Sequence, residues 1–214
     1  DALEKDKTSY KTPADHPACK FPARTNFLET ELDVTFIKPG CEELNNFLKK
    51  MIGPRVSLLF SSYYLNTPAS TFGHTLLKFS KNAEDTEGPT NDHLDYAVSY
   101  AANITTKNAL LYGIMGMVGA FHGEYSIIPY FYKIREYNDY ESREIWSYDL
   151  NLSPEQIKQL LAHLWEMKTT NFNYFYFSEN CSYQLLGLLD SVNPEWNFTE
   201  KMAKIVIPSQ TIQV

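Results

Sequence analysis

The most constraining feature of this sequence is an abrupt change from a strand-like to a helix-like pattern within residues 174–186. An aromatic run ends at a Ser-Glu-Asn turn, and Cys181 then opens a leucine-rich amphipathic segment. The pattern predicts a helix that begins at a cysteine. Main-chain N–H groups at a helix start lack partners and the helix dipole is positive there, so the pKa of a thiol should fall. The alternative is a small apolar core residue, the commoner fate of a free cysteine.

Runs rich in β-branched and aromatic residues elsewhere in the chain predict an antiparallel sheet. We expect strands at residues 55–64, 72–79, 94–101, 125–134 and 143–150, and residues 205–208 to form either a last strand or a lead into a further domain. Helices are predicted at 42–51 and from Pro154 to Met167, where Ser153 and Gln156 form a capping box. Residues 103–123 hold four glycines, so we expect either a helix or a mobile loop over the sheet.

The charge of the chain excludes some classes of partner. Its formal net charge is −7 and its pI is about 5.3, which disfavours binding to nucleic acid or to an anionic membrane surface. The longest apolar stretch, residues 108–121, is too short to span a bilayer. The sequence starts at Asp1 without an initiating Met or an apolar h-region, so we expect any signal peptide to lie outside it.

The chain has three cysteines, and two lie close together in the N-terminal region. That region has little apolar content, and a disulfide between Cys19 and Cys41 would stabilise it by roughly 3 kcal/mol. This pairing leaves Cys181 as a free thiol, whereas three unpaired thiols would fit a reducing compartment. We therefore expect a flexible leader at 1–17, a disulfide-stapled helical segment at 18–53 and a main domain at 54–214.

A cysteine nucleophile needs a base and a third group that holds that base in one tautomer. His74 is the leading base because it lies among apolar residues of a predicted strand, where burying an imidazole is costly without a partner. His16 lies in the leader, His93 in a polar loop and His163 within a helix. His122 follows the glycine-rich segment, and we assign it as a substrate contact.

Competing chemistries leave weaker signals in the sequence. It contains no His-Glu-x-x-His, no paired Cys-x-x-Cys and no Gly-x-Ser-x-Gly, so we expect neither a metal, a cofactor nor a serine hydrolase. A glycosidase with paired carboxylates stays open, because Glu124, Glu136, Glu141 and Glu144 are available. Charged residues of this kind more often form a solvated surface.

Several separated motifs occur together in this chain, and their order resembles the bacterial Lnb N-terminal periplasmic domain family from about Cys19 onward. The resemblance implies an envelope protein of a Gram-negative bacterium, periplasmic or outer-membrane associated, often with a C-terminal β-barrel-like region beyond this segment. The motifs are Cys19-Lys-Phe-Pro-Ala-Arg24, Phe72-Gly-His-Thr75, Tyr130-Phe-Tyr with Glu136-Tyr137, Arg143-Glu-Ile-Trp146 and Glu179-Asn-Cys-Ser182.

That family is in turn similar to circularly permuted NlpC-type papain-like enzymes. The similarity implies an α+β fold in which the cysteine starts a helix on an antiparallel sheet, with a helical N-terminal appendage. It implies Cys181 as nucleophile and His74 as base, with Ser99 or Asn103 as the third residue. Tyr176 would donate to an oxyanion beside the Cys181 amide. The residues that we assign to substrate binding are Asn180, Ser182, Tyr100 and His122.

The leading hypothesis is a periplasmic cysteine hydrolase that cleaves amide bonds in peptidoglycan peptides. The same residues would also suit an acyltransferase or thioesterase acting on lipid-linked acyl groups, with the apolar residues 110–121 lining a groove. A third hypothesis, from another class, is a non-catalytic envelope module for binding or chaperone-like work. The expected partners are peptidoglycan or an acylated envelope substrate, with no nucleic acid.

Overall fold

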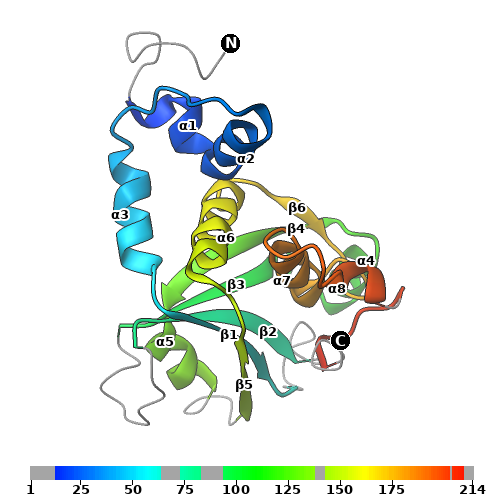
Figure 1. The fold of residues 1–214 in the computed structure, drawn as a ribbon. Helices are drawn as coiled ribbons and strands as arrows, with labels where there is room; N and C mark the ends of the chain where they lie inside the picture. The colour runs from blue at the N-terminus through cyan, green and yellow to red at the C-terminus, as the bar shows by residue number, and fades with distance from the viewer. Residues whose placement is uncertain (1–12, 64–72, 83–93, 138–142, 203, 210–214) are drawn as a thin grey trace.

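The computed structural model describes residues 13–63, 73–82, 94–137, 143–202 and 204–209. The architecture is α+β, with one six-stranded sheet and helices on both of its faces (Figure 1). The strand order is β5-β1-β2-β3-β4-β6, and every neighbouring pair is antiparallel, as predicted. The strands are β1 (Arg55–Ser61), β2 (His74–Ser80), β3 (Tyr96–Asn103), β4 (Phe121–Pro129), β5 (Ile145–Leu150) and β6 (Phe172–Tyr174).

The helices are short, apart from one that carries much of the core. A 3₁₀ turn at Pro13–Asp15 precedes α1, and the longest helix, α6, begins with the predicted capping box of Ser153 and Gln156. The bounds are α1 (Pro17–Lys20), α2 (Pro22–Leu32), α3 (Glu42–Met51), α4 (Ala109–Met117), α5 (Tyr130–Arg135), α6 (Pro154–Met167), α7 (Cys181–Asp190) and α8 (Phe198–Lys201).

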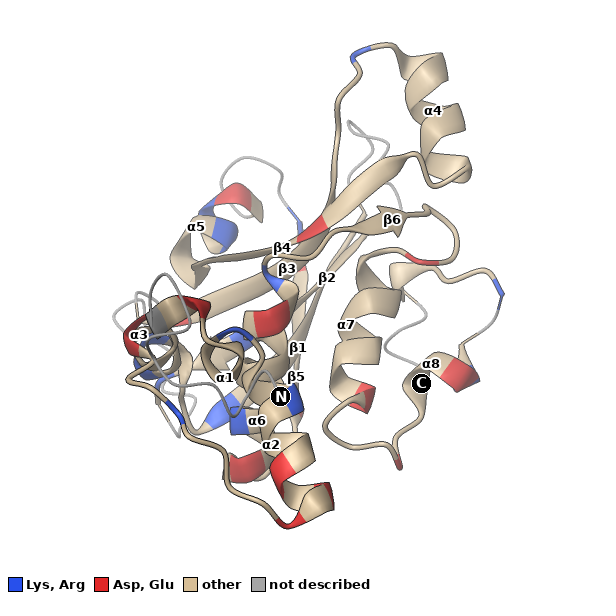
Figure 2. Ribbon diagram, turned by 90° about the horizontal axis from the view of Figure 1, so that it is seen from above, with Lys and Arg blue, Asp and Glu red and all other residues tan. Residues whose placement is uncertain are grey.

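Alternation along the strands gives the sheet two buried faces. Side chains such as Leu77 and Val98 meet α6 and α7 in the larger core, whereas Leu59 and Leu76 meet residues of the α5 segment on the other face. Figure 2 shows α5 on one side of the sheet and α7 on the other. Consecutive residues of β2 therefore point into different layers.

The N-terminal helices are held to the main body through α6. The predicted Cys19–Cys41 disulfide is confirmed. Trp165 on α6 donates its indole N–H to the Cys19 carbonyl at 2.8 Å. Glu166 accepts from the Arg24 amide and pairs with the Arg24 side chain. The disulfide and these contacts offset the small apolar content of this region.

Three expectations about the elements are corrected. Residues 130–134 form helix α5 rather than continuing a strand, because Pro129 has no N–H for the ladder and the Tyr130 amide turns to the Asp95 carbonyl at 2.9 Å. Residues 205–208 form no strand; Val206 instead donates to the Phe177 carbonyl at 2.8 Å. Residues 13–17 of the predicted leader are ordered, and His16 caps α1. Residues 1–12 lie outside the described part.

The glycine-rich segment resolves into defined elements. Residues 103–123 comprise the end of β3, helix α4 and the start of β4. The Asn108 side chain accepts from the amides of Leu110 and Leu111, so it starts the helix despite the glycines that follow. Gly116 is needed for close packing, because a Cβ there would lie 2.1 Å from the Tyr176 ring.

Candidate active site

The turn before α7 is fixed by the buried side chain of Asn180. Its Oδ1 accepts from the Ser182 amide at 3.1 Å and from the Tyr183 amide at 3.4 Å, which caps the helix. Its Nδ2 donates to the Tyr176 carbonyl at 3.1 Å and to the Val206 carbonyl at 2.7 Å. One amide therefore sets the position of Cys181, which is the first residue of α7 as predicted.

The thiol of Cys181 is almost inaccessible to solvent, with 2% of the residue exposed. Burial raises the pKa of this thiol above its ordinary value, although hydrogen bonding from Thr75, Tyr174 and Ser182 opposes the change. The sequence-based expectation of a lowered pKa is wrong, because desolvation outweighs the favourable helix end. The resting thiol is neutral.

The start of α7 is pinned to the first residues of β2. The hydroxyls of Thr75 and Ser182, both fully buried, lie 2.8 Å apart and share a hydrogen bond. The Thr75 main chain also forms a hydrogen bond with the Cys181 sulfur. His74 is the residue immediately before Thr75, so the cysteine lies beside the main chain that carries the predicted base.

The imidazole of His74 is held by the neighbouring strand. Its Nε2 lies 2.7 Å from the Ser99 hydroxyl on β3, and Ser99 stands opposite Leu76, two residues along from His74. This hydrogen bond involves Nε2, and the other ring nitrogen, Nδ1, takes no part in it. Asn103, the other predicted third residue, is exposed and donates to Glu124 at 3.3 Å. The contact with His74 therefore comes from Ser99.

A cavity of about 180 Å³ connects these elements. His74 lines it together with Tyr137 and Tyr174. Burial is the main cause that raises the pKa values of both tyrosine hydroxyls. Tyr174 also accepts a hydrogen bond from the Cys181 amide at 3.4 Å, so Cys181 contacts a residue that lines the cavity but does not itself line it. The remaining lining residues are Ala101, Ala102, Ile104, Lys133, Glu136 and Arg143.

The surroundings of His74 favour its neutral form. Burial, followed by the positive charges of Lys133 and Arg143, lowers the pKa of the imidazole from 6.5 to about 3. Lys133 is itself paired with Glu136 at 2.7 Å, and the Arg143 guanidinium lies over the Tyr137 ring. The Cys181 thiol and the His74 imidazole are therefore both neutral in the resting protein.

This pKa predicts a dependence of stability on pH. Because the folded state holds His74 neutral, unfolding binds a proton below pH 6.5, so stability is complete above 6.5 and falls as pH decreases toward 3. The free energy of unfolding can fall by at most about 1.4 kcal/mol per pH unit from this one group. Because the ring is only partly buried, we expect a smaller slope. Urea unfolding of wild type and His74→Gln should show the two free energies converging as pH falls. Parallel curves would contradict the pKa assignment.

The hydroxyl beside the cysteine is that of Tyr174, not of the predicted Tyr176. The Cys181 amide donates to the Tyr174 hydroxyl at 3.4 Å. Tyr176 is drawn away because its amide donates to the Gly116 carbonyl at 3.0 Å and its ring packs on Tyr112. Sequence reasoning missed Tyr174, and its place at the end of an aromatic strand was the only available signal.

The structure gives other roles to the residues assigned to substrate binding. Asn180 and Ser182 are buried and position the helix, and Tyr100 is a core ring stacked on Tyr174 at 5.7 Å. His122 is exposed on β4 and does not line the cavity. Of the other candidates, Glu136 lines the cavity, whereas His93 and Glu141 lie outside the described residues.

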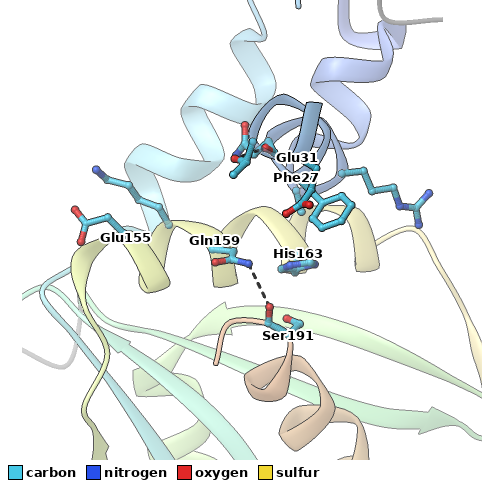
Figure 3. Close-up of a pocket in the computed structure, with 11 residues that line it drawn as sticks. Phe27, Glu31, Glu155, Gln159, His163 and Ser191 are labelled. Carbon is cyan, nitrogen blue, oxygen red and sulfur yellow. Dashed lines mark hydrogen bonds between the residues drawn. The ribbon is translucent and has the colours of Figure 1, made fainter. Parts of the chain in front are cut away.

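A larger pocket of about 570 Å³ lies between α2 and α6 (Figure 3). Phe27 and Glu31 line it from α2, and Gln159 and His163 from α6. It shares no residue with the cavity at His74, and its lining contains no cysteine. Across the described residues, no group of three or more His, Cys, Asp or Glu side chains is placed to hold a metal ion. We therefore place the candidate chemistry at Cys181 and His74.

Comparison with known proteins gives one match. The family model of the Lnb N-terminal periplasmic domain matches residues 43–214. This span contains the whole sheet, the cavity and Cys181, but it begins after the Cys19 motif that the sequence comparison included. No curated protein and no solved structure matched the chain.

Proposed function

This chain belongs to the Lnb N-terminal periplasmic domain family, and we propose that it is a cysteine hydrolase that cleaves amide bonds in peptidoglycan peptides. The observation that carries the proposal is that Cys181 contacts Tyr174, which lines the same cavity as His74, while the bond between Thr75 and Ser182 holds the start of α7 against β2. In this proposal the arrangement resembles that of a permuted papain-like enzyme: Cys181 at a helix start would be the nucleophile, His74 on the adjoining strand the base, and Ser99 on the next strand the third residue. The periplasmic location supports the proposal, because peptidoglycan lies in the same compartment.

The first half of the reaction starts from the neutral pair. As the Cys181 sulfur bonds to the substrate carbonyl carbon, its proton passes to His74 Nδ1, the nitrogen that does not bond Ser99. Negative charge develops on the carbonyl oxygen, where the Tyr174 hydroxyl, which accepts from the Cys181 amide, would be the donor. The imidazolium then gives its proton to the leaving amine as the C–N bond breaks, which leaves a thioester.

The second half regenerates the enzyme with water as co-reactant. His74 takes a proton from water while the water oxygen attacks the thioester carbon, and the acid leaves as the C–S bond breaks and the thiol regains a proton. Ser99 holds the imidazole for both transfers. Because the free imidazole has a pKa of about 3, its protonated form depends on the negative charge that develops beside it.

The cavity favours a polar substrate over an acyl chain. Lys133, Glu136 and Arg143 line it, so it can bind the charged groups of a peptide. The acyltransferase hypothesis needs an apolar groove along residues 110–121, but the outer side chains of α4 are exposed and do not line this cavity. The burial of Cys181 favours a non-catalytic binding module, because a nucleophile must be reached by its substrate. The experiment below distinguishes a binding module from a cysteine hydrolase.

The test is incubation of the chain with purified peptidoglycan sacculi, with released fragments identified by mass spectrometry. We expect new amino and carboxyl ends at one type of peptide bond, together with a transient mass increase on Cys181 from the thioester. His74→Ala should lose both signals. Release of fragments without any adduct at Cys181 would contradict the mechanism, and binding to sacculi without cleavage would support the binding module.

A further inference from the structure

Helix α4 is apolar on every side, but only one side is covered. Tyr112 and Gly116 face inward, where they pack against Tyr176 and Phe121. The outer face is fully aliphatic and open to solvent. It comprises Leu110 at 75% exposure, Leu111 at 48%, Ile114 at 46%, Met117 at 57% and Val118 at 63%. A helix that is hydrophobic all round normally lies in a protein core or in a lipid phase.

The segment that carries α4 is almost uncharged. Lys107 is the one Lys, Arg, Asp or Glu among residues 104–121. Figure 2 shows α4 standing away from the sheet and the other helices, with no acidic or basic residue on the helix itself. Insertion of helix α4 itself into an apolar phase would therefore desolvate no charged side chain.

These properties fit a lipid surface better than a protein partner. Protein interfaces carry roughly one hydrogen bond per 100–200 Å² and a polar rim. The outer side chains Leu110, Ile114 and Met117 have no such groups. No helix within the described ranges is long and apolar enough to cross a membrane. A short aliphatic helix can still lie in the headgroup boundary, and a neighbouring lysine can extend its ammonium to the water.

We propose that α4 is a membrane-docking element whose outer face inserts into the surface of a lipid bilayer. The lipids are neutral or zwitterionic, because the net charge of −7 opposes an anionic surface. The periplasm is bounded by bilayers on both sides, so such a surface is at hand. This inference does not depend on the proposed hydrolase activity.

Docking through α4 would also orient the candidate active site. The Tyr176 amide donates to the Gly116 carbonyl at 3.0 Å, which ties the helix to the turn that precedes Cys181. Phe175 in the same turn packs against Gly119 at the end of the α4 segment. The bilayer would therefore lie at the end of the molecule where that turn is found.

The test is flotation of the intact chain with phosphatidylcholine vesicles. Wild type should float with the vesicles, and raised salt should not release it because the attraction is apolar. The double variant Leu110→Asp/Ile114→Asp should bind at least about tenfold more weakly. A matched control, Phe27→Asp/Ile37→Asp, makes the same charge change at side chains that are 62% and 64% exposed elsewhere, and should float like wild type.

Several outcomes would overturn the proposal. Absence of wild-type binding, or equal losses in both double variants, would exclude docking through α4. Stronger binding when phosphatidylglycerol is added would indicate electrostatic attraction instead. If vesicles do not bind but sedimentation velocity shows self-association that the α4 variant abolishes, the face is a protein interface. Thermal melts of both variants should match wild type, since the replaced side chains are exposed.

Discussion

Replacing Cys181 with alanine should reduce amide hydrolysis by roughly 10⁴-fold or more, because loss of a nucleophile removes the covalent route altogether. The protein should stay folded. The bonds that cap α7 come from Asn180, and the bond between Thr75 and Ser182 does not involve the sulfur. Loss of the buried sulfur leaves the donors of Thr75, Tyr174 and Ser182 without this acceptor, which should cost about 1–3 kcal/mol. Turnover on sacculi and the melting temperature, measured on the same preparation, check both statements.

A neighbouring substitution serves as the matched control. Ser182→Ala removes the hydroxyl that bonds Thr75 and leaves a buried group unsatisfied, at a cost of about 1–3 kcal/mol. It should therefore lower the melting temperature, and because it also removes one hydrogen bond to the Cys181 sulfur but keeps the nucleophile, it should reduce turnover far less than Cys181→Ala does. If Cys181→Ala keeps its activity, the proposed mechanism is wrong. If both variants lose activity and stability in parallel, Cys181 is a structural residue and the binding module is favoured.

Replacing Asn180 with aspartate should destabilise the protein by about 3 kcal/mol or more and should also abolish turnover. Aspartate is ordinarily as good a helix cap as asparagine. Here, however, Nδ2 donates to the carbonyls of Tyr176 and Val206, so a carboxylate would place a buried charge against two acceptors. Urea unfolding at neutral pH measures the loss.

The cap of α4 provides a control with the same chemical change. Asn108 also accepts from two helix amides, but its side chain is exposed, and within the described part of the chain its Nδ2 donates to no carbonyl. Asn108→Asp should change stability by no more than about 0.5 kcal/mol, with the helix dipole favouring the new charge. Equal losses at both positions would show that the carbonyl contacts of Asn180 do not explain its effect.

The two pKa directions define the resting state of the candidate site. In many cysteine hydrolases a helix end and a nearby histidine favour a thiolate, and the sequence led to that expectation. Burial instead raises the pKa of Cys181 and lowers that of His74 to about 3, so neither group is charged at neutral pH. Proton transfer must then accompany the attack on the carbonyl rather than precede it.

Local physics made several features predictable from sequence alone. The Ser153 capping box, the alternation in β1 and β2 and the helix start at Cys181 each depend on residues a few positions apart. The Cys19–Cys41 disulfide followed because three cysteines allow few pairings and the N-terminal region lacks apolar residues. The family resemblance, too, depended on short motifs in order.

Tertiary structure alone decided the properties of the site, because these depend on segments far apart in the chain. Ser99 rather than Asn103 contacts His74 because of the register of β2 against β3. Tyr174 rather than Tyr176 lies beside Cys181 because the Tyr176 amide bonds to the Gly116 carbonyl of α4. The sign of the Cys181 pKa shift is the sum of desolvation and of donors from β2, β6 and α7. No local sequence pattern includes all of these contributions. The sequence therefore predicted a cysteine at a helix start, whereas the packing around Cys181 determined its protonation state.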